Sequence, residues 1–282
     1  MSHAIYFPHS PIAGRETPEY LDHKGNQLYV VHHQQPKEAV AVVVLAGPMS
    51  LERSQSYLTW VRWARTLACN GYDVYRFDYR GVGESTGAFR EQTFDTWLDD
   101  LRTVVALARS RHTGARVLAN GIRLGALLSQ RCHDEASVDG CLLWEPPVNG
   151  NAMLTDMLRR KLAADYIEQV GERKTREAYI ADLEAGLDVE VEGYPWTRAL
   201  WRSSKDYVFA EPKQRSSTWH TIYLDGRGPE KLPNARYESV KVPRPAFWLQ
   251  SQHLVADLDD LFTKSLGWMA RCSSPVNNGS FT

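Results

Sequence analysis

The feature that most constrains the fold is an apolar segment that runs through a glycine-framed turn into a helix. Residues 117–122 read Val-Leu-Ala-Asn-Gly-Ile, and Arg-Leu-Gly and an apolar helical pattern follow. A buried strand that enters a helix through Gly-x-X-x-Gly makes a sharp elbow, whose glycines leave room for a strained central residue. That central residue is usually a serine nucleophile, and here it is Arg123.

Arg123 cannot act as a nucleophile. Its guanidinium stays protonated in proteins and offers N–H donors but no lone pair. A cation at a helix N-terminus is disfavoured by ~0.3–1 kcal/mol, and burying it without a partner costs more. We therefore expect an anion beside Arg123. It is either an internal carboxylate, with Glu84, Glu145 and Asp225 as candidates, or the acid group of a bound ligand.

The composition argues against several classes of function. The chain has 33 Lys and Arg residues and 34 Asp and Glu residues, so no global field attracts nucleic acid or an anionic membrane. Residues 1–8 lack the basic and apolar segments of a signal peptide, and no apolar run approaches the ~20 residues that span a bilayer. We therefore expect a cytoplasmic protein, whose four scattered cysteines stay reduced.

Strands and helices are expected to alternate along the chain. The predicted strands are 26–33, 39–46, 73–79, a strand from Val117 into the elbow at Gly121, 141–144, 218–224 and 235–242. The predicted helices are 57–70, 94–111, the elbow to about 133, and 254–269. This alternation predicts an α/β fold with a mostly parallel, twisted sheet flanked by helices. Ligands on such sheets bind at the carboxyl ends of the strands.

The chain is expected to contain one core and one insertion. Residues 1–150 and 206–270 form the predicted core. Residues 151–205 are strongly charged, largely helical in pattern and without a confident strand, so we expect a helical cap inserted over the sheet. Residues 271–282, rich in Ser, Asn, Pro and Gly, are expected to form a flexible tail.

Three motifs in this order resemble the α/β-hydrolase superfamily. They are the apolar strand that ends in Gly47-Pro48, the segment Phe-Asp-Tyr-Arg-Gly-Val-Gly-Glu-Ser at 77–85, and the elbow. The resemblance covers most of the chain and implies the α/β-hydrolase fold. It also implies a Ser-His-Asp mechanism, which the elbow contradicts.

Two short stretches resemble one subgroup of that superfamily. Gly-Ile-Arg-Leu-Gly-Ala-Leu-Leu at 121–128 and Leu-Trp-Glu-Pro-Pro-Val-Asn-Gly at 143–150 are similar to exosortase-associated hydrolases. That bacterial group is linked by gene context to surface-protein sorting and exopolysaccharide production. Some of its members also carry Arg at the elbow.

The other two members of a triad are only weakly indicated. Asp225 ends a predicted strand and is the best candidate for the acid, although an Asp before Gly is equally typical of a turn. Glu145, at the end of the strand beside the elbow, is the second candidate. The histidine should follow the last strand, and His253 comes several residues late, so a surface position is the competing interpretation. His220 lies inside a predicted strand, which favours a core role.

An oxyanion hole can outlast the loss of the nucleophile, because backbone amides form it. The amide of Leu124 and one from the loop after Ala46 are the expected donors. Pro48 has no N–H, so Met49 or a later residue must supply the second donor. Among the nearby hydroxyls, Ser50 is the one worth testing as a substitute nucleophile.

These residues lead to three hypotheses. We favour a degenerate hydrolase that binds a small anionic, acyl or sugar-derived ligand around Arg123. The alternatives are an active ester or thioester hydrolase with a non-standard nucleophile, and a non-catalytic interaction protein of a surface-polysaccharide or protein-sorting pathway. No His, Cys, Asp and Glu grouping has zinc spacing, and Gly-x-Gly-x-x-Gly is absent, so neither a metal nor another cofactor is expected.

Overall fold

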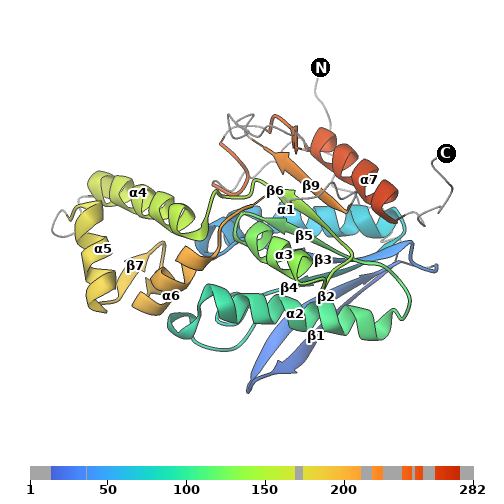
Figure 1. Ribbon diagram of the computed structural model, residues 1–282, viewed down its shortest axis with the longest axis horizontal. Coiled ribbons are helices and arrows are strands. Elements are labelled where there is room, and N and C mark those ends of the chain that lie inside the picture. The colour runs from blue at the N-terminus through green and yellow to red at the C-terminus, as the bar shows by residue number, and fades with distance from the viewer. Residues whose placement is uncertain are drawn as a thin grey trace.

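An eight-stranded sheet forms the centre of the computed structural model, which describes residues 14–35, 37–168, 174–210, 218–224, 237–242, 245–249 and 258–273 (Figure 1). The strand order is β1-β2-β4-β3-β5-β6-β9-β10. The strands are β1 Arg15–His23, β2 Asn26–Gln34, β3 Ala41–Ala46, β4 Tyr72–Phe77, β5 Val117–Ile122, β6 Gly140–Trp144, β9 Trp219–Tyr223 and β10 Tyr237–Ser239. From β4 to β10 the pairs are parallel, as predicted, while β1 and β2 are antiparallel.

The hairpin of β1 and β2 adds a strand that the sequence did not predict. Lys24 and Gly25 join the two strands, and both have positive φ, 48° and 78°. This is the two-residue turn whose twist matches that of paired strands. The residues of β1 are exposed or half-buried, which explains the missing apolar alternation.

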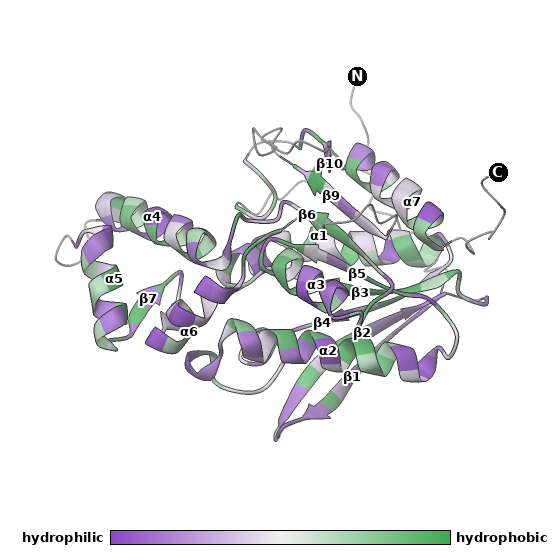
Figure 2. Cartoon of the chain, viewed as in Figure 1, coloured by the Kyte–Doolittle hydropathy of each residue, from purple (hydrophilic) through white to green (hydrophobic). Residues whose placement is uncertain are grey.

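Helices cover both faces of the sheet. One face carries α1 Ser50–Cys69 and α7 Asp259–Ser273, and the other carries α2 Phe94–Arg111 and α3 Leu124–Asp134. Successive side chains of β3 alternate between two hydrophobic cores, with Val42 and Val44 against α2 and α3, and Val43 and Leu45 against α1 and α7. Figure 2 shows α2 and α7 alternating hydrophilic and hydrophobic residues, as expected for helices with one buried side.

The predicted bounds of the helices were correct to different degrees. The prediction for α2 matches its observed bounds, and Thr93 and Thr96 cap its first turn reciprocally. In contrast, α1 begins at Ser50, well before the predicted residue 57. Glu52 and Ser56 are buried in this first part of α1, so its inward face is polar and lacks the apolar spacing used for prediction.

The segment between β6 and β9 lies at one end of the sheet (Figure 1). It contains α4 Gly150–Glu168, α5 Arg176–Ala185, β7 Val189–Val191, β8 Tyr194–Trp196, α6 Arg198–Ser203 and the short 3-10 helix η2 Ser204–Asp206. The hairpin of β7 and β8 was not predicted. The buried side chains of Met157 and Trp196 belong to the same core as Trp97 of α2, which anchors this segment.

The predicted C-terminal tail begins too early. Residues 271–273 complete α7, in which Cys272 is buried against the sheet. The predicted start of this helix at 254 and the rest of the tail, 274–282, lie outside the described residues.

Gly121 and Gly125 of the elbow are required because neighbouring backbone atoms leave no room for a side chain at either residue. A Cβ atom on Gly121 would lie 2.1 Å from the carbonyl oxygen of Gly125. A Cβ on Gly125 would lie 1.9 Å from the carbonyl oxygen of Ala46, in β3. The start of α3 is therefore pressed against both strands, and this contact fixes the elbow.

We expect Gly125→Ala to lower the free energy of unfolding by about 3 kcal/mol, because backbone atoms must separate to admit the methyl group. Gly267→Ala is the matched helical control, since the nearest atom to its Cβ would be Arg271 Nη1 at 3.6 Å. It should stabilise the protein by up to about 1 kcal/mol. Urea unfolding of both variants measures the difference, and equal effects would contradict the packing argument.

Candidate functional site

The elbow keeps the backbone conformation of a nucleophile turn although its central residue is Arg123. This residue has φ 54° and ψ −115° and precedes the first residue of α3. Its N–H donates to the carbonyl of Trp144 in β6 at 3.2 Å. A non-glycine residue in this region stores about 1–3 kcal/mol of strain, which the surrounding structure must hold.

The partner of Arg123 is Glu52, in the first turn of α1. Arg123 Nε donates to Glu52 Oε2 at 3.2 Å, and Arg123 Nη2 donates to Glu52 Oε1 at 3.4 Å. The side chains are 13% and 1% exposed. Burial alone would lower the pKa of the Arg123 guanidinium, but the charge and hydrogen bonds of Glu52 outweigh it, so the pKa is raised. The structure thus places an internal carboxylate, Glu52, beside Arg123.

The prediction named three other carboxylates, of which the structure describes two, Glu84 and Glu145. Glu84 is exposed, in the loop after β4. Glu145 acts on Arg123 by Coulombic attraction, while its Oε2 accepts a 2.6 Å bond from Leu224 N–H. Asp225 lies outside the described residues. The prediction failed because Glu52 is in a part of α1 that was expected to be loop.

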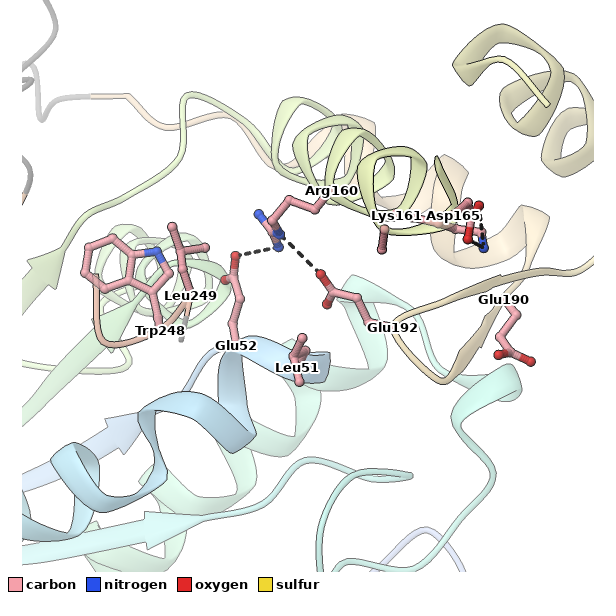
Figure 3. A pocket seen from close by; sticks show the side chains of 10 residues that line it. Leu51, Glu52, Arg160, Lys161, Asp165, Glu190, Glu192, Trp248 and Leu249 are labelled. Atoms are coloured by element: carbon pink, nitrogen blue, oxygen red, sulfur yellow. Dashed lines mark hydrogen bonds and ion pairs between the residues drawn. The ribbon is translucent and has the colours of Figure 1, made fainter. Parts of the chain in front are cut away.

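Glu52 also joins the elbow to the inserted segment (Figure 3). Arg160 of α4 donates from Nη2 to Glu52 Oε1 at 3.0 Å and from Nε to Glu192 Oε1 at 3.2 Å. Glu192 and Gly193 form the turn between β7 and β8, with φ 54° and 83°, and this turn directs the glutamate towards α4. Arg123, Glu52, Arg160 and Glu192 therefore form one alternating chain of charges.

A cavity of about 410 Å³ lies beside this chain of charges. Its walls are Leu51 and Glu52 of α1, Arg160, Lys161, Ala164 and Asp165 of α4, Glu190 and Glu192 of the hairpin, and Trp248 and Leu249 (Figure 3). Four carboxylates and two cations line it, together with the apolar surface of Trp248. Arg123 is not part of the wall, and Glu52 connects the wall to the elbow.

The charged groups that line the cavity differ in their pairing. Burial raises the pKa of the Glu192 carboxyl, although the charge of Arg160 opposes the shift, and among the described residues Glu192 Oε2 has no hydrogen-bond partner. Lys161 and Asp165 form an ion pair of 3.1 Å along α4. Glu192 thus takes up a proton more readily than an ordinary glutamate.

The described residues do not assemble a catalytic triad. Glu145 ends β6 beside the elbow, as predicted, with φ 43°. His253, like Asp225, lies outside the described residues. A triad histidine was expected in the segment after β10. Trp248, in that segment, lines the cavity. His220 is 9% exposed in β9 and stacks on Trp268, which confirms its core position.

The proposed oxyanion amides lie at two helix starts. Leu124 is the first residue of α3, and Met49 precedes α1 in extended conformation. Amides at such positions have no partner within their helix, so they are suited to bind an anion. Their role stays a prediction. Ser50, next to Met49, is fully buried with φ 50°, and no described residue forms a hydrogen bond with its hydroxyl.

Sequence reasoning missed Glu52, Arg160, Glu192 and Trp248. Three of these are charged residues within charged stretches, where nothing in the local pattern marks a buried partner. The dipeptide Glu192-Gly193 was the available signal, since it is compatible with a two-residue hairpin turn.

We expect Glu52→Gln to lower the free energy of unfolding by about 3–5 kcal/mol, because it leaves the buried Arg123 facing a neutral side chain. Glu135→Gln is the matched control. It breaks a surface pair with Arg102, in which the side chains are 36% and 41% exposed, and should cost at most about 1 kcal/mol. The double variant Arg123→Met/Glu52→Leu should recover much of the loss in urea unfolding. A cost no greater than that of the control would show that the pair is not buried.

Comparisons with known proteins agree with this architecture. The family model for serine aminopeptidase, S33, matches residues 41–182, about half of the chain. No curated protein sequence matches.

Solved structures resemble the chain over most of its length. They include ferulic acid-bound Est1E from Butyrivibrio proteoclasticus (17% identity, TM-score 0.60, 90% of this chain and 98% of that one). A soluble variant of monoglyceride lipase from Saccharomyces cerevisiae, in complex with a substrate analogue, covers 96% and 99% at 13% identity and a TM-score of 0.58. A lidless α/β serine hydrolase from Xanthomonas campestris covers 91% and 94% at 18% identity and a TM-score of 0.55. At these identities the likeness shows the fold.

Within the described residues, no helix is both long and apolar enough to cross a membrane. The sheet order, the elbow and the family match agree, and the chain belongs to the serine aminopeptidase S33 family of the α/β-hydrolase superfamily.

Proposed function

We propose that this protein binds a small ligand in the cavity beside Glu52 and has lost serine-type hydrolysis. One observation carries the proposal: the elbow residue is Arg123, paired with Glu52, and both are largely buried. A guanidinium has no lone pair with which to attack an acyl carbon. A buried ion pair is also costly to break, so Arg123 is unsuited to movement during a reaction cycle.

The cavity suits a small ligand in size and position. Its volume of about 410 Å³ falls in the usual range of small-molecule sites. It is bounded by the start of α1 and by α4, close to the carboxyl ends of the strands, where sheets of this kind bind ligands. Trp248 and Leu249 offer apolar surface for the body of a ligand, and the charged groups offer orientation.

The ligand class that we propose is a small anionic compound, acyl or sugar-derived, whose acid group binds Arg160. Arg160 is one-third exposed and lines the cavity, whereas Arg123 does not. An incoming acid competes with Glu52 and Glu192 for the guanidinium. Because the pKa of Glu192 is raised, its protonation can release Arg160 and reduce the repulsion of the ligand.

Ester or thioester hydrolysis with another nucleophile is the second candidate, and Ser50 is the residue that favours it. Ser50 follows Met49 and has a positive φ, and its hydroxyl has no hydrogen-bond partner among the described residues. Full burial of Ser50 opposes this candidate, because a nucleophile must reach its substrate.

We expect the purified protein to show no turnover of short-chain p-nitrophenyl esters or acyl thioesters and no labelling by a serine-directed fluorophosphonate. The reason is the absence of a nucleophile at residue 123. Turnover that disappears in Ser50→Ala would overturn the proposal. Arg123→Ser, measured beside both, tests whether the rest of a catalytic apparatus is intact.

We expect inorganic phosphate or a small sugar acid such as glucuronate to raise Tm, and Arg160→Ala to remove this shift. Arg159→Ala is the matched control, because Arg159 neighbours Arg160 on α4 but is 61% exposed and paired with Asp156. An equal loss in both variants would place the anion elsewhere.

The affinity for the anion should increase as the pH falls towards the raised pKa of Glu192, since protonation removes a competing carboxylate. Titration calorimetry at several pH values measures this dependence. Glu192→Gln should bind the anion with a weaker dependence on pH, and an unchanged pH profile would remove Glu192 from the mechanism.

A further inference from the structure

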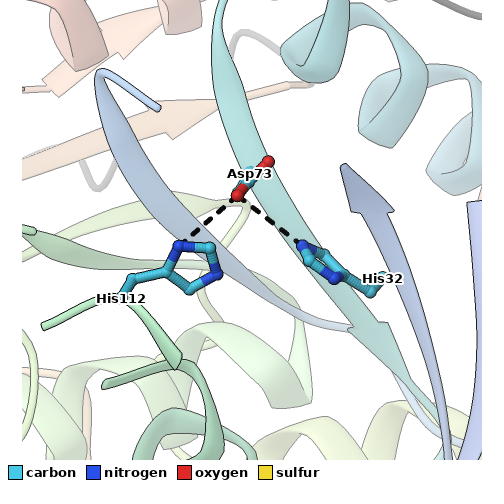
Figure 4. A group of neighbouring side chains, drawn as sticks. All are labelled: His32, Asp73 and His112. Atoms are coloured by element: carbon cyan, nitrogen blue, oxygen red, sulfur yellow. Dashed lines mark ion pairs between the residues drawn. The ribbon is translucent and has the colours of Figure 1, made fainter. Parts of the chain in front are cut away.

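Two histidines and an aspartate come together near the amino-terminal end of β4, at the end of the sheet opposite the elbow (Figure 4). Asp73 is near the start of β4, His32 is on the neighbouring β2, and His112 directly follows α2. The elbow, in contrast, follows the carboxyl end of β5, which runs parallel to β4 through β3. This group is therefore separate from the cavity and from the proposed function.

The spacing of the three side chains suits a metal ion better than direct hydrogen bonds. Nδ1 of His112 lies 3.4 Å from Oδ2 of Asp73, and Nε2 of His32 lies 3.7 Å from the same oxygen. Zinc bonds of about 2.0–2.2 Å at tetrahedral angles place neighbouring ligand atoms about 3.4 Å apart. The three ligand atoms all lie within 4.8 Å of one another, so small ring movements would complete the triangle.

The surroundings of the two rings favour ligation. Nε2 of His32 is buried and, within the part of the chain that the structure describes, has no hydrogen-bond partner, although it faces Asp73. The hydroxyl of Tyr75 lies 2.9 Å from Nε2 of His112, which fixes the ring with Nδ1 towards Asp73. A partner on the second nitrogen is the usual support of a metal-bound histidine.

A hydrogen bond fixes the orientation of the Asp73 carboxylate. Its Oδ1 accepts a 2.9 Å bond from Gln35 N–H, which leaves Oδ2 directed at both histidines. The nearby cation Arg111 is neutralised by Glu19, whose Oε2 lies 2.7 Å from its Nη2. The repulsion of an incoming ion by Arg111 is therefore reduced.

A second group of similar composition serves as a contrast. His23, Asp99 and Asp100 also come together, but protein cations already neutralise both carboxylates. Lys24 Nζ lies 2.8 Å from Asp99, and Arg80 Nε lies 2.6 Å from Asp100. His23 Nε2 itself is within 2.7 Å of Asp99. Lysine and arginine side chains therefore already compensate the negative charges of this group.

We infer that His32, Asp73 and His112 bind a divalent transition-metal ion of the Zn²⁺ class, with water as the fourth ligand. The donor set of two imidazoles and one carboxylate is typical of zinc and its neighbours in the first row. The ion joins β2, β4 and the end of α2, segments that are distant in the sequence. Its role is structural, since the site lies away from the elbow and the cavity.

The test uses the full chain after treatment with a chelator, titrated with Zn²⁺ alone by calorimetry. One tight equivalent is expected, with a rise in Tm of at least ~3 °C. Co²⁺ in place of Zn²⁺ should give the visible absorption of a tetrahedral ion. His32→Ala, Asp73→Asn and His112→Ala should each weaken this equivalent by more than ~100-fold, and Tyr75→Phe by about 10-fold.

His23→Ala is the matched control, and it should bind Zn²⁺ as the unaltered protein does. Asn at residue 73 keeps an acceptor for Gln35 N–H, so that variant distinguishes loss of a ligand from loss of folding, which circular dichroism of the metal-free protein monitors. The inference is overturned if the unaltered protein binds no tight equivalent. It is equally overturned if that equivalent survives in all three ligand variants.

Discussion

The buried ion pair of Arg123 and Glu52 is the interaction on which the candidate site depends. Each charge alone would be costly to bury, and a cation at the start of α3 is opposed by the helix dipole. Glu52 answers both problems, because it is 1% exposed and lies in the first turn of α1, where an anion is favoured. The early start of α1 at Ser50, with a positive φ, brings this carboxylate to the elbow.

The same carboxylate couples the core to the inserted segment. Because Glu52 accepts bonds from both Arg123 and Arg160, the position of α4 is tied electrostatically to the elbow. Glu192 continues the alternation to the hairpin. The charged groups on one wall of the cavity thus pair with one another. A ligand that binds Arg160 would have to replace one of its ion pairs with Glu52 or Glu192.

The fold was predictable from the sequence to a greater extent than the site. The continuous apolar run of β3 and the helical periodicity of α2 are visible in adjacent residues, so the places of these elements and the fold class were predicted correctly. The half-exposed β1 and the polar start of α1 carry no such signal. The partner of Arg123 and the ligand atoms around Asp73 come from segments far apart in the chain, and only the tertiary structure brings them together.

The geometry of the elbow does not depend on which residue it presents. Gly121 and Gly125 allow β3, β5 and α3 to approach closely, and residue 123 lies between them at positive φ. The strained turn is therefore present although its central residue is arginine. In this protein the strained position instead fixes a guanidinium against Glu52, which orients a carboxylate of the cavity wall. The backbone that presents a nucleophile in an α/β hydrolase here supports the shape and charge of the cavity wall.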